Sequence, residues 1–263
     1  MSTITDDVAA AARLVEWGLR PRQVPARDLE YADLVRRHGE DDAFADLVKA
    51  VAAGFNLLIL DVDPRSGIVL APREDSVFAV RIEEYAKRTA LSSRGTDKVV
   101  HGIAHLAVAA LAYPRPDDLA NDSYVGYVTV DQVDGVVRDA CRVLDERAAQ
   151  AEENNDPLET APELERAWRA YARRPAAAGT KDGRAASDTT RGMVAKAVRF
   201  LADQGFLVVR NDENGGAYRT TPRFQVQVRE LAANAAFREL TSLGVVTVTD
   251  ASGSLHAVHS DTL

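Results

Sequence analysis

One short pattern occurs twice in this chain and limits the folds that it can adopt. In each copy an amphipathic helical stretch ends near a glycine, a phenylalanine follows, and a short apolar strand begins. The first copy covers residues 51–57 (VAAGFNL) and the second covers residues 201–207 (LADQGFL). Glycine is suited to ending a helix, and the apolar strand after it needs a partner strand. We therefore expect two units in which a helix leads directly into a β-hairpin.

The residues around the first copy predict a small domain of three helices and a hairpin. Apolar residues at helical spacing occur in three stretches, near residues 14–19, 29–35 and 44–51. The segment 63–67 (DPRSG) is typical of a type I turn closed by a left-handed glycine, and residues 68–70 return as a second strand. Three helices followed by a hairpin is the order of a winged helix-turn-helix domain. We assign residues 1–92 to this first, acidic domain.

The second copy ends a longer series of the same kind. An apolar helical stretch at 97–112 leads to a predicted strand at 124–128, and Thr129 or Asp131 can cap the helix that follows. A later helix, capped by Ser187 or Asp188, leads into a hairpin. We assign residues 93–263 to a second winged-helix domain, with a polar insertion at about 150–187 and a C-terminal hairpin. The predicted fold is mainly α with small β-hairpin wings (α+β), as tandem winged helix-turn-helix domains.

The segment after the second hairpin allows two interpretations. Residues 224–228 (FQVQV) alternate as in a strand, whereas Phe224, Val228 and Leu231 continue a helical spacing. Thr221 can cap a helix, and Pro222 fits its first position, where no amide hydrogen is needed. We favour the helix.

Charge is distributed unevenly along the chain. Its formal net charge is −8, yet residues 166–229 hold 13 Arg or Lys and 5 Asp or Glu, a local charge of +8. The remainder therefore carries −16 and would repel phosphate. The first domain has Asp41, Asp42 and Asp46 where a DNA-reading helix would be basic, which favours protein pairing there.

The basic region supplies the candidate DNA contacts. With Val194, Val198 and Leu201 facing the core, four residues of the same helix point outward: Gly192, Lys196, Arg199 and Asp203. Such a face can enter a groove or contact phosphates, although it can equally be a solvated surface or a docking site for an acidic partner. The candidate DNA-binding residues are Lys181, Arg184, Arg191, Lys196, Arg199, Arg210, Arg219 and Arg223.

No pattern in the sequence indicates catalysis. His101 and His105 stand four residues apart, a spacing that can bind zinc, but the first histidine lacks the adjacent Glu of the zincins and the helix is very apolar. We interpret both as packing residues and residues 61–67 (DVDPRSG) as a turn. There is no nucleophile elbow and no phosphate-binding loop. We expect no catalytic residues, no cofactor and no metal, and a protein that is not an enzyme.

Two further features concern the cellular compartment. Cys141 is the only cysteine, which excludes an internal disulfide and points to a reducing cytoplasm. The sequence contains no run of about 18 apolar residues and no signal-peptide pattern at the N-terminus, so we expect neither membrane spanning nor export.

The wing exit at residues 218–224 (YRTTPRF) resembles that of many bacterial winged-helix proteins. Two such units in one acidic chain are similar to the tandem winged-helix (kite) subunits of bacterial SMC or condensin-type complexes, the MukE-like proteins, including the Wadjet plasmid-defence homologues. The resemblance implies a cytoplasmic, nucleoid-associated homodimer that binds a kleisin and, through it, an SMC ATPase, and that contacts double-stranded DNA weakly and without sequence preference. The alternative is a stand-alone transcriptional regulator that reads DNA with its second domain.

Overall fold

The computed structural model is mainly helical with small antiparallel sheets, which confirms the expected α+β class. The chain forms two compact units, described separately below. Unit 1 comprises residues 1–81, 203–206 and 221–230, and unit 2 comprises residues 82–202, 207–220 and 231–263. The residues that the structure describes are 4–73, 75–90, 96–153, 171, 189–211, 216–231, 248–249 and 255–256.

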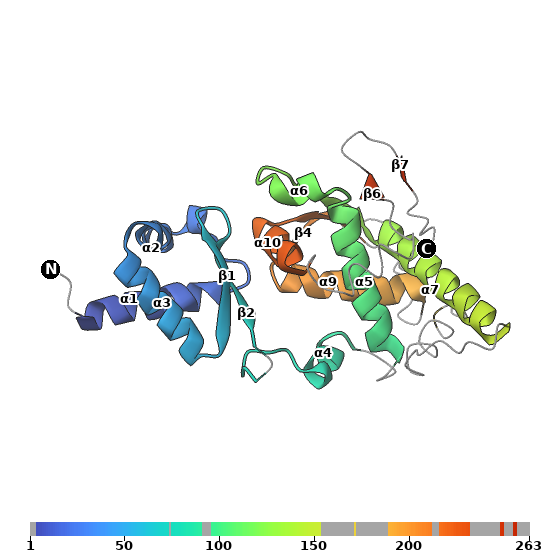
Figure 1. Ribbon diagram of the computed structural model, residues 1–263, viewed down its shortest axis with the longest axis horizontal. Helices are drawn as coiled ribbons and strands as arrows, with labels where there is room; N and C mark the ends of the chain where they lie inside the picture. Colours follow the sequence, from blue (N-terminus) through green and yellow to red (C-terminus); the bar gives the residue numbers. More distant parts are fainter. Residues whose placement is uncertain are drawn as a thin grey trace, which may run out of the picture. The chain divides into compact units, whose positions relative to one another are not determined.

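The N-terminal part of unit 1 consists of helices α1, α2 and α3 followed by the hairpin of β1 and β2 (Figure 1). Helix α1 packs on α3, and the strands pair antiparallel in the order β1-β2. A short 3-10 helix, η1, precedes α2, and helix α10, which is distant in sequence, also belongs to this unit. The bounds are α1 (Ile4–Gly18), η1 (Pro25–Arg27), α2 (Leu29–Glu40), α3 (Asp42–Gly54), β1 (Leu57–Asp63), β2 (Gly67–Pro72) and α10 (Pro222–Leu231).

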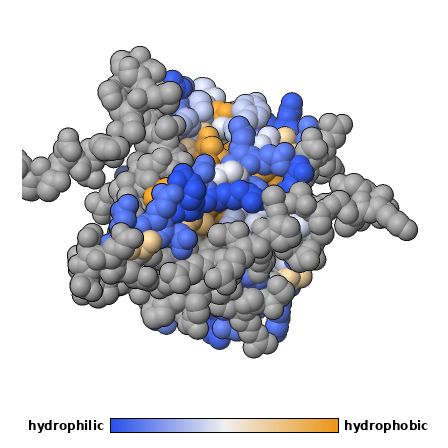
Figure 2. Space-filling model, turned by 90° about the vertical axis from the view of Figure 1, so that its right-hand side faces the viewer, coloured by the Kyte–Doolittle hydropathy of each residue, from blue (hydrophilic) through white to orange (hydrophobic). Residues whose placement is uncertain are grey.

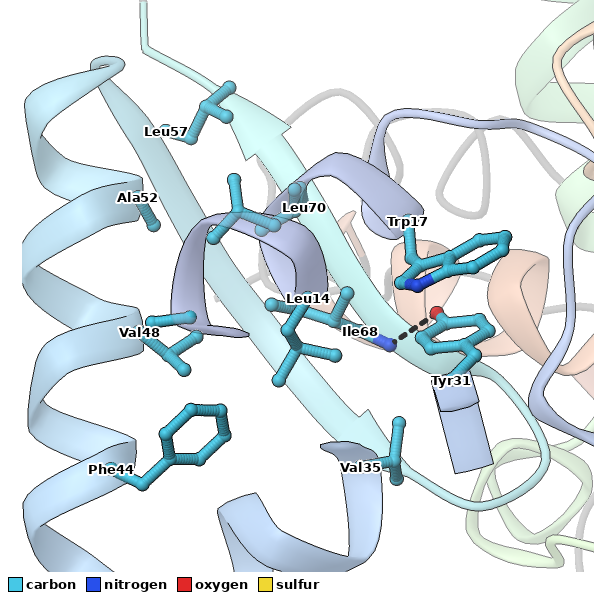
Figure 3. Packing of buried hydrophobic residues seen from close by; sticks show 12 residues of the cluster. Leu14, Trp17, Tyr31, Val35, Phe44, Val48, Ala52, Leu57, Ile68 and Leu70 are labelled. Atoms are coloured by element: carbon cyan, nitrogen blue, oxygen red, sulfur yellow. Dashed lines mark hydrogen bonds between the residues drawn. The ribbon is translucent and has the colours of Figure 1, made fainter. Parts of the chain in front are cut away.

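The core of unit 1 lies between its helices and β2 (Figure 3). Leu14, Val48 and Ile68 are fully buried, as expected for the apolar faces of amphipathic elements. Tyr31 adds a polar contact, because its hydroxyl accepts a 2.9 Å hydrogen bond from the backbone N–H of Ile68. Trp17 stacks on Tyr31 with ring centroids 5.2 Å apart. These two aromatic residues therefore tie α1 and α2 to the hairpin.

The turn between β1 and β2 has the predicted chemistry. Gly67 has a φ of +69°, in the left-handed region that glycine tolerates best. Oδ1 of Asp63 accepts backbone N–H hydrogen bonds from Arg65 (2.7 Å) and Ser66 (3.3 Å). The Asp63 carboxylate is thus used within the turn.

Unit 2 contains the remaining elements (Figure 1). Helix α5 packs against α7, and strands β3, β4 and β5 form a small sheet. Strands β6 and β7 pair antiparallel where the C-terminal hairpin was predicted. The bounds are α4 (Ile82–Arg88), α5 (Thr96–Ala112), α6 (Pro116–Ala120), β3 (Tyr127–Thr129), α7 (Val130–Glu153), α9 (Thr190–Asp203), β4 (Leu207–Asn211), β5 (Ala217–Thr220), β6 (Val248–Thr249) and β7 (Leu255–His256).

The sheet of unit 2 has the order β3-β5-β4, with both pairs antiparallel. Its inner face is apolar: Val128 lies opposite Tyr218, and both are buried. Leu207, opposite Thr220, continues this face at the start of β4. The last strand of the wing therefore lies in the middle of the sheet and pairs with a strand from much earlier in the chain.

Two predicted helix starts are confirmed in detail. Thr129 Oγ1 accepts from the backbone N–H of Gln132 (3.2 Å), and Gln132 Oε1 accepts in return from the backbone N–H of Thr129 (3.0 Å), a capping box at the start of α7. Thr221 Oγ1 accepts from the backbone N–H of Phe224 (3.2 Å) at the start of α10. The helical interpretation of residues 222–231 is therefore correct and the strand interpretation of 224–228 is wrong.

Candidate nucleic-acid interface

Helix α9 orients the central part of the candidate interface. Val194, Val198 and Leu201 are buried as predicted, and Arg199 and Asp203 are exposed. One expectation is wrong, because Gly192 is buried and not directed to solvent.

The start of α9 explains that difference. Thr189, itself fully buried, lies directly before the helix, and its Oγ1 accepts a 3.0 Å hydrogen bond from the backbone N–H of Gly192. The first turn of α9 is therefore buried and capped within the protein. The predicted caps, Ser187 and Asp188, lie outside the described residues.

Two of the candidate cations on α9 are already engaged within unit 2. Arg191 forms an ion pair with Asp131 at the start of α7, with Nη2 2.9 Å from Oδ1, and its side chain is only 23% exposed. The ammonium group of Lys196 donates to the carbonyl of Ala90 at 3.1 Å. Both side chains have structural partners, and a phosphate would have to compete with them.

Arg223 has a structural position in unit 1. Its Nη1 donates to the carbonyl of Arg20 at 3.3 Å, and its Nη2 donates to the carbonyl of Gly18, the last residue of α1. Carbonyls at a helix C-terminus lack intrahelical partners, and a cation there also complements the helix dipole. Burial lowers the pKa of the guanidinium. We therefore interpret Arg223 as a cap on α1.

Three candidates remain available for contact with phosphates, namely Arg199 on α9, Arg210 on β4 and Arg219 on β5. All three side chains are exposed. Within the described part of the chain, none of them takes part in an ion pair or a side-chain hydrogen bond. The other two predicted residues, Lys181 and Arg184, lie outside the described residues.

Arg219 stands in a row of exposed residues across the sheet. It lies opposite Tyr127 on β3 and opposite Val208 on β4. Residues directly opposite each other in antiparallel strands share a face, so the three side chains are neighbours. Tyr127 is 63% exposed and Val208 is 39% exposed. Sequence reasoning missed Tyr127, because the partner of the short strand β3 is distant in sequence.

The exposed Arg142 of α7 is paired with acidic residues of the same helix. Nη1 of Arg142 lies 2.8 Å from Oε1 of Glu146, and its Nε lies 3.9 Å from Oδ1 of Asp139. Figure 2 shows the side of the structure on which α7 lies, where the described residues are mostly hydrophilic. Such exposed pairs contribute little stability, and the net charge of α7 is negative because its acidic residues outnumber its arginines.

The two histidines considered as zinc ligands belong to an aromatic cluster. The hydroxyl of Tyr85 on α4 lies 2.6 Å from Nδ1 of His101, and Nε2 of His105 donates to the carbonyl of Ala197 at 3.2 Å. Phe200 of α9 contacts the ring of Tyr85, with centroids 4.6 Å apart. Burial lowers the pKa of His105 to about 4.

This arrangement gives both histidines a packing role. In the ranges that the structure describes, no three His, Cys, Asp or Glu side chains come together as a metal site would require. Tyr85 was missed by sequence reasoning because α4 is too short to have a clear apolar period.

Unit 1 has an exposed apolar patch around the start of β1. The rings of Phe55 and Phe78 meet edge to face, with centroids 6.0 Å apart. The hydroxyl of Ser76 donates to the carbonyl of Phe55 at 3.2 Å and fixes the segment after β2 beside the end of α3. The exposed apolar residues of this patch are Phe55, Leu58, Val77, Phe78 and Val80.

Asp41 and Asp46, two acidic residues at the start of α3 and within it, have partners inside unit 1. Oδ1 of Asp41 accepts from the backbone N–H of Phe44 at 3.0 Å, and its other oxygen pairs with Arg37. Asp46 lies 3.3 Å from the ammonium group of Lys49. The hydrogen bond to Phe44 lowers the pKa of Asp41, as does the ion pair.

Comparison with known proteins does not identify the chain. No protein-family model matches it, and no curated protein matches it. In the described residues, no helix is both long enough and apolar enough to cross a bilayer.

Proposed function

We propose that unit 2 is built around a DNA-binding winged helix. The observation that carries the proposal is the order α5, β3, α7, α9, β4, β5 together with the sheet order β3-β5-β4. In a winged helix, the first strand pairs with the last, and the third helix and the wing face the DNA. Helix α9 and strands β4 and β5 then correspond to the recognition helix and the wing.

The placement of unpaired charge supports the same assignment. Arg199, Arg210 and Arg219 lie on the recognition helix and on the two strands of the wing. Guanidinium groups on such surfaces contact phosphates and carry no sequence information by themselves. We therefore propose weak, non-specific contact with double-stranded DNA, with affinity that depends strongly on salt.

We propose further that the protein is a non-catalytic subunit of an SMC or condensin-like complex, with unit 1 as a second winged helix that binds protein partners. The three helices and hairpin of unit 1 support this, as does its exposed apolar patch. Exposed apolar surface of this kind commonly marks a protein interface. The partners proposed are a second copy of the chain and a kleisin that links it to an SMC ATPase.

The test compares two triple variants of equal charge change. Changing Arg199, Arg210 and Arg219 to Glu should abolish binding to a random duplex, measured by fluorescence anisotropy at low salt. The control changes Arg27, Arg73 and Arg81 of unit 1 to Glu, because these arginines are also exposed. Equal losses in both variants would mean that net charge alone governs binding, and normal binding by the first variant would contradict the proposed interface.

A titration of salt and sequence separates the proposal from its alternative. Each phosphate contact contributes about 0.9 to the slope of log affinity against log salt for B-DNA. The first triple variant should lose most of that slope. A preference of roughly 10³-fold or more for one sequence would instead indicate a transcriptional regulator.

A further inference from the structure

The outer face of the unit 2 sheet carries an aromatic ring that neither the core nor the proposed duplex contact explains. The face is defined by Tyr127, Arg219 and Val208, one residue from each strand. We propose that this face binds single-stranded nucleic acid, with a base stacked on Tyr127 and the backbone phosphates at Arg219. This goes beyond the proposed duplex binding, which relies on the three arginines and does not need the ring.

Tyr127 is exposed on a strand whose position is fixed by its buried neighbour. Tyr127 is 63% exposed, although Val128, the next residue, is 1% exposed on the inner face of the sheet. The strand is therefore held in register by its buried neighbour, and the ring projects from a defined backbone. In the described part of the chain, no other aromatic ring contacts Tyr127.

The side chains beside Tyr127 are a cation and an aliphatic residue. Arg219 is directly opposite Tyr127, and side chains in such pairs have Cβ atoms about 5 Å apart. Arg219 forms no ion pair with any described residue, and Arg210, on the neighbouring strand, is also exposed and unpaired there. The aliphatic side chain of Val208 extends the apolar part of the face.

An exposed ring beside an unpaired arginine matches a single strand better than a duplex or an acidic protein. A single strand presents both a flat base and an anionic backbone, whereas a duplex keeps its base faces stacked inside the helix. Proteins bind single strands by combining aromatic side chains with a positively charged surface. An acidic protein would satisfy Arg219 and leave the ring without a matching group. A single strand, with exposed base faces and an anionic backbone, therefore matches the ring of Tyr127, the guanidinium of Arg219 and the apolar side chain of Val208.

The experiment uses the full chain and two labelled probes at the same low salt, a 20-nucleotide oligo(dT) and a 20-base-pair duplex of random sequence. Stacking of a base on an aromatic side chain contributes enough that removing the ring should weaken oligo(dT) binding roughly tenfold. Tyr127→Thr removes the ring and keeps a residue favoured in strands, and Tyr127→Phe keeps the ring. We expect the first variant to lose oligo(dT) affinity, the second to retain it, and both to bind the duplex as the wild type does.

Phe78→Ala is the matched control, since it removes an exposed ring from unit 1 and should leave oligo(dT) binding unchanged. Unchanged oligo(dT) affinity in Tyr127→Thr, or no oligo(dT) binding by the wild type, would overturn the proposal. An equal loss for both probes would also overturn it, because the ring would then serve duplex binding. Duplex binding that fails in the wild type, with ring-dependent oligo(dT) binding intact, would refute the proposed function and leave this inference standing.

Discussion

The hydroxyl of Tyr171 donates a 2.7 Å hydrogen bond to Oδ1 of Asp134 on α7. The other carboxylate oxygen of Asp134 accepts from Nε and Nη2 of Arg138, at 2.9 Å and 2.8 Å. Tyr171 lies in the predicted insertion at about 150–187, yet only 1% of its surface is exposed. Its burial and the adjacent Asp134 raise the pKa of the tyrosine. Tyr171 therefore belongs to the core of unit 2.

Removing that hydroxyl should destabilise the protein. Tyr171→Phe leaves the carboxylate of Asp134, which is 13% exposed, with one partner fewer, and a hydrogen bond to a charged group contributes about 1.5–3 kcal/mol. Urea unfolding followed by circular dichroism measures the loss. Tyr127→Phe is the control, because its hydroxyl is on an exposed side chain, and it should unfold at the wild-type urea concentration. Equal midpoints for all three proteins would contradict a structural role for the Tyr171 hydroxyl.

A methyl group at Gly67 should be poorly tolerated. A Cβ atom there would lie 1.8 Å from the hydroxyl oxygen of Tyr31, and the φ of +69° is unfavourable for alanine. We expect Gly67→Ala to lower the free energy of unfolding by about 2 kcal/mol or more. The control is Gly39→Ala in helix α2, where a Cβ would meet nothing within 4 Å. That change should be neutral or stabilising, since alanine is the better helix former.

Acid should destabilise the protein partly through His105. Its pKa is about 4 in the folded protein, below the ordinary 6.5, so the unfolded chain binds a proton more readily. The contribution of neutral His105 to the free energy of unfolding is fully present above pH 6.5 and is lost as the pH falls toward 4. The loss amounts to about 3 kcal/mol for a shift of this size. His105→Gln can keep the hydrogen bond to Ala197, and its unfolding free energy should fall less than that of the wild type between pH 7 and pH 4.5. Parallel curves for the two proteins would show that His105 is not the group responsible.

Arg223 should matter for stability and not for DNA. Arg223→Met removes the cap on the C-terminus of α1 and should cost about 1–2 kcal/mol. Arg229→Met removes an exposed arginine from the same helix and serves as the control. Thermal unfolding compares the two variants, and duplex binding by Arg223→Met should match that of the wild type. A variant that melts normally but binds DNA weakly would restore the sequence-based assignment.

The exposed patch of unit 1 should mediate self-association. Val77 is 88% exposed, and burying such residues in a symmetric dimer of roughly 1,000 Å² or more would remove them from water. We expect the wild type to be dimeric at tens of micromolar by light scattering, and Val77→Asp with Phe78→Asp to be monomeric. The control, Val208→Asp on the unit 2 sheet, should remain dimeric. A monomeric wild type would refute the prediction.

Local chemistry explains which parts of the fold were predictable. The helix over residues 190–203, the turn at 63–67 and the cap at Thr221 depend on residues close together in sequence. Helices α4 and α6 were missed because 7 and 5 residues are too few to establish a period.

The candidate site was predictable only in part, for a related reason. Arg199 was predicted from its charge and its place on a predicted helix. Arg191 and Arg223 have the same two properties. Whether an arginine is free depends on partners that are remote in sequence: Asp131 for Arg191 and Gly18 for Arg223. A wheel of one helix contains no information about such partners. The three available arginines could therefore be separated from the engaged ones only with the folded structure.

Because residues 203–206 and 221–230 belong to unit 1, that unit is assembled from segments that lie far apart in the sequence. Besides Arg223, Gln227 of α10 also reaches it and donates through its side-chain amide to the carbonyl of Leu70 at 3.3 Å. A ribosome that has made only the first 92 residues has not yet supplied these groups. Unit 1 can reach its final form only after α9 and the wing have been translated, because α10 follows both in the chain and supplies part of unit 1.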